Sequence, residues 1–198
     1  LGAPPLQPHI PIYLASLGPK NLELTGQLAD GWLPIWVHHR RLPELKEQIA
    51  EAATQAGRDV SQITVAPQIL CYVTETPEEL AETERQTRSH MAYYIAGMGQ
   101  YYYNLFCRFG FQAEADAVRE AWGAGQRAKA AAAISDEMVE NIPIIGDAAT
   151  CRAKLDQFRR DGADMPVIAF PHGSDLPGIQ RTLEALAPGN HGQSAPKP

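Results

Sequence analysis

One stretch near the start decides the fold class of this chain: Pro11-Ile12-Tyr13-Leu14-Ala15-Ser16-Leu17-Gly18-Pro19-Lys20-Asn21, which runs on to Leu28-Ala29-Asp30-Gly31-Trp32. Its first apolar run predicts a short buried strand, and Gly18-Pro19 predicts a tight turn that opens an amphipathic helix. A second strand begins near Trp32. The rest of the chain repeats this alternation of strand and helix, which is typical of an α/β fold with parallel strands.

The turn at Gly18-Pro19 also has a chemical interpretation. Backbone N–H groups at a helix N-terminus attract anions, and the helix dipole favours a negative charge there. The turn is therefore a candidate phosphate or cofactor site. A purely structural βα turn, with Pro19 at the first helical position, explains the same residues. On the local sequence alone, both interpretations stay open.

The alternating pattern predicts four strands, each followed by helix, at residues 10–15, 32–37, 63–74 and 165–170. Thr76 and Asp147 are predicted helix N-caps, and Ser135 is expected to cap a further short helix. Periodicity does not distinguish half of an eight-stranded βα barrel from a small doubly wound sheet.

Residues 97–145 interrupt this alternation after the third strand. They carry a cluster of Tyr and Phe residues, and we expect them to form a helical insertion, as part of a lid or an interface. An aromatic cluster of this kind more often packs than recognises a ligand. Residues 188–198, rich in Gly, Pro, Ser and Lys, are expected to be a disordered tail.

Composition narrows the functional class. The 198 residues suffice for one domain, and 17 basic against 23 acidic side chains leave a formal charge of −6. That charge balance argues against a nucleic-acid-binding surface, which would be basic. A membrane-spanning helix needs about 18 consecutive apolar residues, and no apolar run in the sequence is that long. Cys71, Cys107 and Cys151 are widely spaced and predict neither a zinc site nor a disulfide framework. We expect a cytoplasmic protein without a metal. Because the chain starts with Leu1 and almost at once with a strand, we also expect it to be a fragment.

These residues resemble the luciferase-like monooxygenase superfamily, and are most similar to its branch of oxidoreductases that use the deazaflavin coenzyme F420. The resemblance covers nearly the whole chain up to about residue 187. It is carried by the opening stretch and by the following sequences: Ala56-Gly57-Arg58-Asp59, Tyr103-Asn104-Leu105-Phe106-Cys107-Arg108-Phe109-Gly110-Phe111, Ile145-Gly146-Asp147 and Arg152-Ala153-Lys154-Leu155.

The resemblance implies a (β/α)8 TIM barrel. Residues 1–187 would be its C-terminal half, with four βα units (strands five to eight) and the helical insertion, about 97–145, after the third strand of this chain. The other half, which would hold most candidates for proton transfer, would lie outside the chain. We therefore assign no catalytic residue, and we expect the fragment to be inactive alone and the full-length enzyme to be a homodimer.

The resemblance also implies a cofactor site in the turn after the first strand. Carried over by position, Ser16, Leu17, Gly18 and Asn21 would hold the phosphate region of the cofactor. His38 and His172 follow later strands, at the barrel end where active sites lie, and are the candidate substrate-binding residues. Both could equally be ordinary loop residues. Arg108 could face an anion, but we favour a structural role for it.

The chemistry implied is hydride transfer between C5 of F420 and an unidentified small organic substrate. Two alternatives remain open. The first is a monooxygenase that uses FMN in place of F420. The second is a non-catalytic flavin-binding relative, in which a half-barrel would persist by dimerising.

Overall fold

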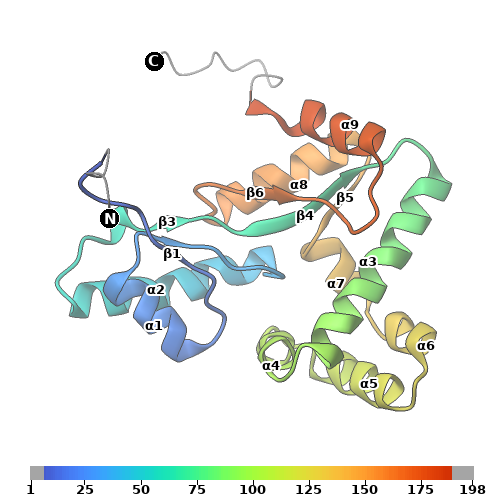
Figure 1. Ribbon diagram of the computed structural model, residues 1–198, viewed down its shortest axis with the longest axis horizontal. Helices are drawn as coiled ribbons and strands as arrows, with labels where there is room; N and C mark the ends of the chain where they lie inside the picture. Colours follow the sequence, from blue (N-terminus) through green and yellow to red (C-terminus); the bar gives the residue numbers. More distant parts are fainter. Residues whose placement is uncertain (1–6, 189–198) are drawn as a thin grey trace, which may run out of the picture.

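The computed structural model describes residues 7–188 and shows an α/β architecture built on short parallel strands (Figure 1). Of the expected tail, only residue 188 lies within that range. The strands form two three-stranded sheets, in the orders β1-β2-β3 and β5-β4-β6. They are β1 (Tyr13–Leu14), β2 (Gly31–Trp32), β3 (Thr64–Val65), β4 (Gln68–Val73), β5 (Ile144–Gly146) and β6 (Val167–Ala169).

The two sheets are parts of one continuous surface. Strand β3 runs directly into β4, with a break at Ala66-Pro67, so the single strand predicted for 63–74 is interrupted. Pro67 has no N–H to donate to a ladder, which accounts for the break. A parallel bridge between Ile35 and Gln68 joins the end of β2 to the start of β4. Each of the four predicted strand regions therefore contributes to the sheet, but over fewer residues than expected.

Strand β5 was not counted among the predicted strands. Ile144, Ile145 and Gly146 pair in parallel with Cys71, Tyr72 and Val73 of β4. The segment is three residues long and apolar throughout, so it carries no alternation that would mark it as a strand. The helical part of the insertion therefore ends before residue 144.

Helices cover the sheet segment by segment. In Figure 1, α1 (Pro19–Leu28) and α2 (Leu42–Gln55) lie together against β1–β3, whereas α8 (Ala148–Arg160) and α9 (Leu176–Leu186) lie against β4–β6. Helices α1 and α2 approach closely at Gly26, where a Cβ atom would lie 2.3 Å from the carbonyl oxygen of Ile49. Two short 3-10 helices, η1 (His39–Arg41) and η2 (Val60–Gln62), flank α2.

The insertion is helical, as expected, and gathers at the lower right of Figure 1. It follows the long helix that starts at Thr76, where the Oγ1 atom accepts a hydrogen bond from Glu79 N at 3.1 Å. That long helix is α3 (Pro77–Gly97). The helices of the insertion are α4 (Tyr101–Arg108), α5 (Gln112–Gly123), α6 (Arg127–Ala132) and α7 (Asp136–Asn141). Ser135 precedes α7 as expected, but its side chain makes no capping hydrogen bond.

The hydrophobic core joins the insertion to the sheet. Phe106, Phe109 and Phe111 are buried in the same cluster as Trp32 of β2 and Ile69 of β4. The phenylalanines of the aromatic cluster thus pack, as expected, whereas Tyr101 is 72% exposed. Among the described helices, none is long and apolar enough to span a membrane.

Candidate functional site

A pocket of about 720 Å³ lies between the N-terminus of α1 and helix α4 of the insertion. It joins two segments that are some eighty residues apart in the sequence, the predicted cofactor turn and the aromatic insertion. Its lining contains two basic side chains and no acidic one. The residues are Gly18, Pro19, Lys20, Asn21, Tyr101, Tyr103, Asn104, Cys107, Arg108 and Gln112.

The start of α1 faces this pocket without a cap. Gly18 is in an extended conformation, Pro19 occupies the first turn, and no described side chain caps the helix. The Gly18 carbonyl accepts hydrogen bonds from Asn21 N at 3.0 Å and Leu22 N at 2.9 Å. No atom lies within 4 Å of the position a Gly18 Cβ would occupy, so the turn is open on that side. An uncapped helix N-terminus with free space beside it suits an anion.

Ser16 lies in the same turn but faces away from the pocket. Its hydroxyl is buried, 2.7 Å from Thr25 Oγ1, and Thr25 Oγ1 donates its own hydrogen to Asn21 O at 2.8 Å. Ser16 is therefore the donor to Thr25. The Ser16 carbonyl accepts a hydrogen bond from Trp32 Nε1 at 2.8 Å. These contacts make Ser16 a residue that shapes the turn.

Arg108 ties the insertion to the turn. Its guanidinium donates a hydrogen bond to the carbonyl of Leu17, a residue that packs against the core. Partial desolvation lowers the pKa of Arg108, although the carboxylate of Glu44 opposes that shift. The guanidinium group remains charged at neutral pH, because the ordinary pKa of an arginine side chain is far above 7. Arg108, Lys20 and the α1 dipole thus give the pocket a positive potential.

Of the two predicted substrate residues, His38 is in the interior. It is 5% exposed, its ring stacks on Phe111 with centroids 6.0 Å apart, and its Nδ1 accepts a hydrogen bond from Arg40 N at 3.2 Å. Burial, with the neighbouring positive charges of His39 and Arg40, lowers the pKa of His38 to about 4. The aromatic contacts and the backbone partner of His38 are those of a neutral imidazole packed in the interior.

His172 is exposed in the loop after β6 and lies near α3. Burial lowers the pKa of His90 on that helix, and the charge of His172 lowers it further. Neither His172 nor His38 lines the pocket at Gly18.

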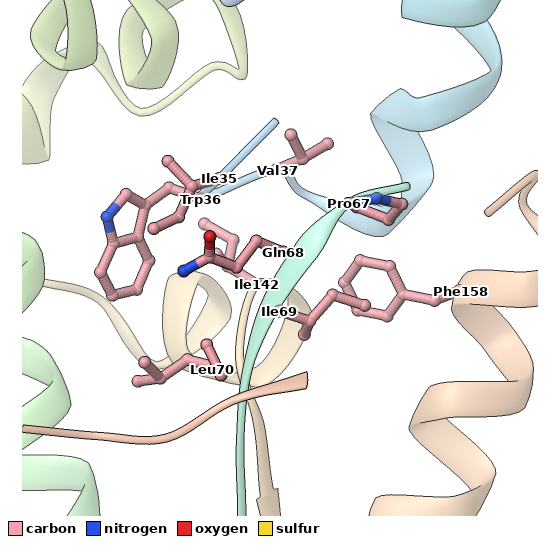
Figure 2. Close-up of a pocket in the computed structure, with 10 residues that line it drawn as sticks. Ile35, Trp36, Val37, Pro67, Gln68, Ile69, Leu70, Ile142 and Phe158 are labelled. Carbon is pink, nitrogen blue, oxygen red and sulfur yellow. The ribbon is translucent and has the colours of Figure 1, made fainter. Parts of the chain in front are cut away.

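A small cavity opens where β2 meets β4, beside Trp36 and Gln68 (Figure 2). Its open volume of about 10 Å³ has room for roughly one water molecule. Figure 2 shows the Gln68 side chain pointing from β4 toward the Trp36 indole. The sequence analysis did not single out either residue, because both lie within predicted strands, Trp36 in 32–37 and Gln68 in 63–74.

His39, the neighbour of His38, was not among the predicted site residues, yet it makes specific contacts. Its Nδ1 lies 2.5 Å from Asp161 Oδ2 and its Nε2 lies 3.0 Å from Asn141 Oδ1. The Asn141 amide also donates to Glu137 O at 2.8 Å. His39 thus ties η1 to the ends of α7 and α8, which no local sequence signal could reveal, since its partners are over one hundred residues away. Within residues 7–188, no cluster of His, Cys, Asp and Glu side chains has the makings of a metal site.

Comparison with known proteins identifies the family and the fold to which this chain is similar. Residues 2–165 match the family model described as luciferase-like monooxygenase. A Mycobacterium tuberculosis protein whose name describes it as a coenzyme F420-dependent oxidoreductase is 28% identical over 172 residues, which are 83% of this chain and 48% of that protein. The 5,10-methylenetetrahydromethanopterin reductase of Methanopyrus kandleri is 28% identical over 84% of this chain and 46% of its own length.

The fold also matches a solved structure. The coenzyme F420-dependent tetrahydromethanopterin reductase from Methanopyrus kandleri superposes with a TM-score of 0.70 at 22% identity, over 89% of this chain and 49% of that one. The chain therefore spans about half the length of the relatives it matches.

Proposed function

The chain belongs to the luciferase-like monooxygenase family, and on that premise we propose that it is the C-terminal half of an oxidoreductase that transfers a hydride between coenzyme F420 and a small organic substrate. The observation that carries the proposal is the positive pocket between α1 and α4. F420 and FMN both carry a phosphate in the side chain of the ring, and the uncapped α1 N-terminus, Asn21, Lys20 and Arg108 supply donors for it.

The half-barrel arrangement is part of the proposal. The sequence repeats strand and helix through four units, and the chain aligns with 46–49% of its relatives' lengths. Strands β1 and β6 each have a neighbour on one side only among the described residues, so their free edges offer backbone groups with which further strands could pair. The missing units would complete the barrel, and the active site would lie at the C-terminal ends of its strands.

The residues of this chain would bind and orient rather than react. When bound, F420 supplies the hydride chemistry at C5 of its ring. Gly18 and Asn21 would fix the phosphate at the edge of the barrel. The Arg108 contact to Leu17 would hold the insertion against the turn and keep water away. Our prediction that His172 contacts substrate stays open, and the contacts of His38 favour a structural role for it.

The experiment is a fluorescence titration of the full-length protein with F420 and, separately, with FMN. We expect saturable binding of F420, and tighter binding of FMN would instead favour the flavin-dependent alternative. Binding of neither compound would refute the proposal. The titration also measures whether 1–198 alone retains the phosphate site, and sedimentation of the full-length protein tests the expected homodimer.

Arg108→Gln tests the pocket itself. Loss of one charge-assisted contact should weaken F420 binding by about tenfold or more, and Arg108→Lys should lose less. Arg127→Gln is the matched control, because Arg127 is in the same insertion but packs on Trp122, outside the pocket. Equal affinities for Arg108→Gln and Arg127→Gln would exclude Arg108 from the site.

A further inference from the structure

Trp36, at the end of the second strand region, has a strained backbone. Its φ angle is +59°, and it is the single non-glycine residue with positive φ among those described. A bulky side chain rarely adopts this left-handed conformation, which costs free energy and persists only when the surroundings enforce it. Strain of this kind is concentrated at functional sites.

The Trp36 indole is also incompletely satisfied. It is 3% exposed, yet Nε1 has no hydrogen-bond partner within the described part of the chain. Trp32, four residues earlier and equally buried, donates its Nε1 hydrogen to Ser16 O at 2.8 Å. Buried polar groups are nearly always paired, so the two tryptophans differ in a way that calls for a cause.

His90, which packs against Trp36, also has a buried nitrogen without a hydrogen-bond partner in the described structure. His90 of α3 meets the indole edge-on with centroids 5.3 Å apart, and its Nδ1 is likewise buried without a partner among residues 7–188. Tyr94, one turn later, contacts both rings at 5.4 and 5.0 Å. Burial and the charge of His172 lower the pKa of His90, so its imidazole is neutral at pH 7.

The contact between Trp36 and His90 thus combines a strained backbone with two buried nitrogen atoms that have no partner among the described residues. Trp36 lies four residues after the end of β2, and in the barrel proposed above the active site would lie at the C-terminal ends of the strands. The contact is also close to the loop of His172. A strained backbone and two unpaired buried nitrogens each lower the stability of the fold. Proteins retain such features mainly at functional sites, so their coincidence here indicates a binding function.

We propose that Nε1 of Trp36 and Nδ1 of His90 are contact points for the substrate, which presents an uncharged oxygen acceptor, a carbonyl or hydroxyl group, to them. This inference rests on the proposed function and adds the class of substrate. Indole can only donate, so its partner must be an acceptor. The rings that contact each other here, those of Trp36, His90 and Tyr94, carry no fixed positive charge that would balance a carboxylate. Both nitrogen atoms are buried, and the small cavity beside Trp36 would have to widen for a substrate to reach them.

The first test is the stability of full-length His90→Leu. Leucine is similar in size and has no nitrogen to leave unpaired. If the nitrogens are kept for a ligand, the urea midpoint of His90→Leu should equal or exceed that of the wild type, while F420 binding is unchanged. A lower midpoint would show that His90 stabilises the fold and would overturn the inference.

The second test follows oxidation of reduced F420 by cyclohexanone, which is reduced to cyclohexanol. Cyclohexanecarboxylate and cyclohexylamine have the same ring but accept no hydride, so they are added as competing ligands. We expect turnover of the ketone and, in Trp36→Phe, a KM for it raised about tenfold or more. Trp122→Phe, the same change at an insertion residue outside the contact, should leave KM unchanged. Competition by either charged compound at concentrations well below the KM for the ketone, or an unchanged KM in Trp36→Phe, would overturn the inference.

The two tests separate this inference from the proposed function. Failure of the wild type to bind F420 refutes the proposed function. Normal F420 binding combined with a lower urea midpoint of His90→Leu refutes only the contact inferred here. If no compound is turned over, the midpoint alone decides.

Discussion

Ser16 and Asn21 belong to one turn but have different surroundings. The Ser16 hydroxyl is buried against Thr25, whereas the Asn21 side chain is exposed and lines the pocket. Proximity in sequence therefore does not make them equivalent cofactor contacts. The two can be separated by measuring stability and affinity on the same variants.

Ser16→Ala should affect stability and not affinity. The change removes a buried hydrogen bond to Thr25, and we expect a loss of about 1 kcal/mol in the free energy of unfolding. Affinity for F420, measured by fluorescence titration, should stay within about twofold of the wild type, because the hydroxyl does not face the pocket. A large loss of affinity with unchanged stability would instead make Ser16 a direct ligand.

Asn21→Asp should change stability and affinity in opposite directions. An acidic side chain in the first turn of α1 interacts favourably with the helix dipole, by roughly 0.3–1 kcal/mol. The same charge would repel a bound phosphate, so F420 affinity should fall by about tenfold or more. Urea unfolding and fluorescence titration measure the two effects. A gain in F420 affinity would place the phosphate elsewhere.

Of two predicted helix N-cap residues, Asp147 makes a capping hydrogen bond and Ser135 does not. Asp147 caps α8 by accepting a hydrogen bond from Thr150 N at 2.7 Å, as its position predicted. Ser135 holds the equivalent position before α7, yet its Oγ is buried without a partner in the described structure. The two residues therefore provide a capped helix and a matched uncapped one.

Asp147→Ala should lower Tm by roughly 2–4 °C, whereas Ser135→Ala should leave it unchanged or slightly higher. The backbone hydrogen bond from Thr150 lowers the pKa of Asp147. A lowered pKa in the folded state gives stability that is present above about pH 4 and lost as pH falls through the folded value. The Tm difference between wild type and Asp147→Ala should therefore shrink below pH 4 in calorimetry, and a constant difference would contradict the cap.

The exposed edge of the sheet is a property of the molecule as a whole. Strand β1 pairs only with β2 among the described residues, and the side chain of Ile12, next to β1, is 58% exposed. An open strand edge beside apolar side chains invites association with other chains. In the complete barrel that we propose, further strands would cover this edge.

Residues 1–198 alone should therefore associate in a concentration-dependent way, as measured by sedimentation velocity. Ile12→Lys should reduce the association, because a charged side chain next to an edge strand opposes pairing. Leu28→Lys is the control, since Leu28 is 68% exposed at the far end of α1. Equal association of Ile12→Lys and Leu28→Lys would show that the edge at β1 is not the contact.

The sequence by itself determined the order of strands and helices, the α/β class and the turn at Gly18-Pro19. These features depend on local patterns: apolar runs, glycine and proline at turns, and capping residues such as Thr76 and Asp147. Strand β5 was not predicted, because three apolar residues are too few to show the alternation of a strand. The strand at 63–74 was predicted as unbroken, although Pro67 interrupts it.

Only the tertiary structure decided which residues meet. It brought Arg108 of the insertion to the turn at Leu17, joined His39 to Asp161, and left Trp36 and His90 in contact without partners. Each of these contacts spans more than fifty residues of chain. Local preferences do not encode such distances, because they arise from how the layers of sheet and helix pack around a shared core.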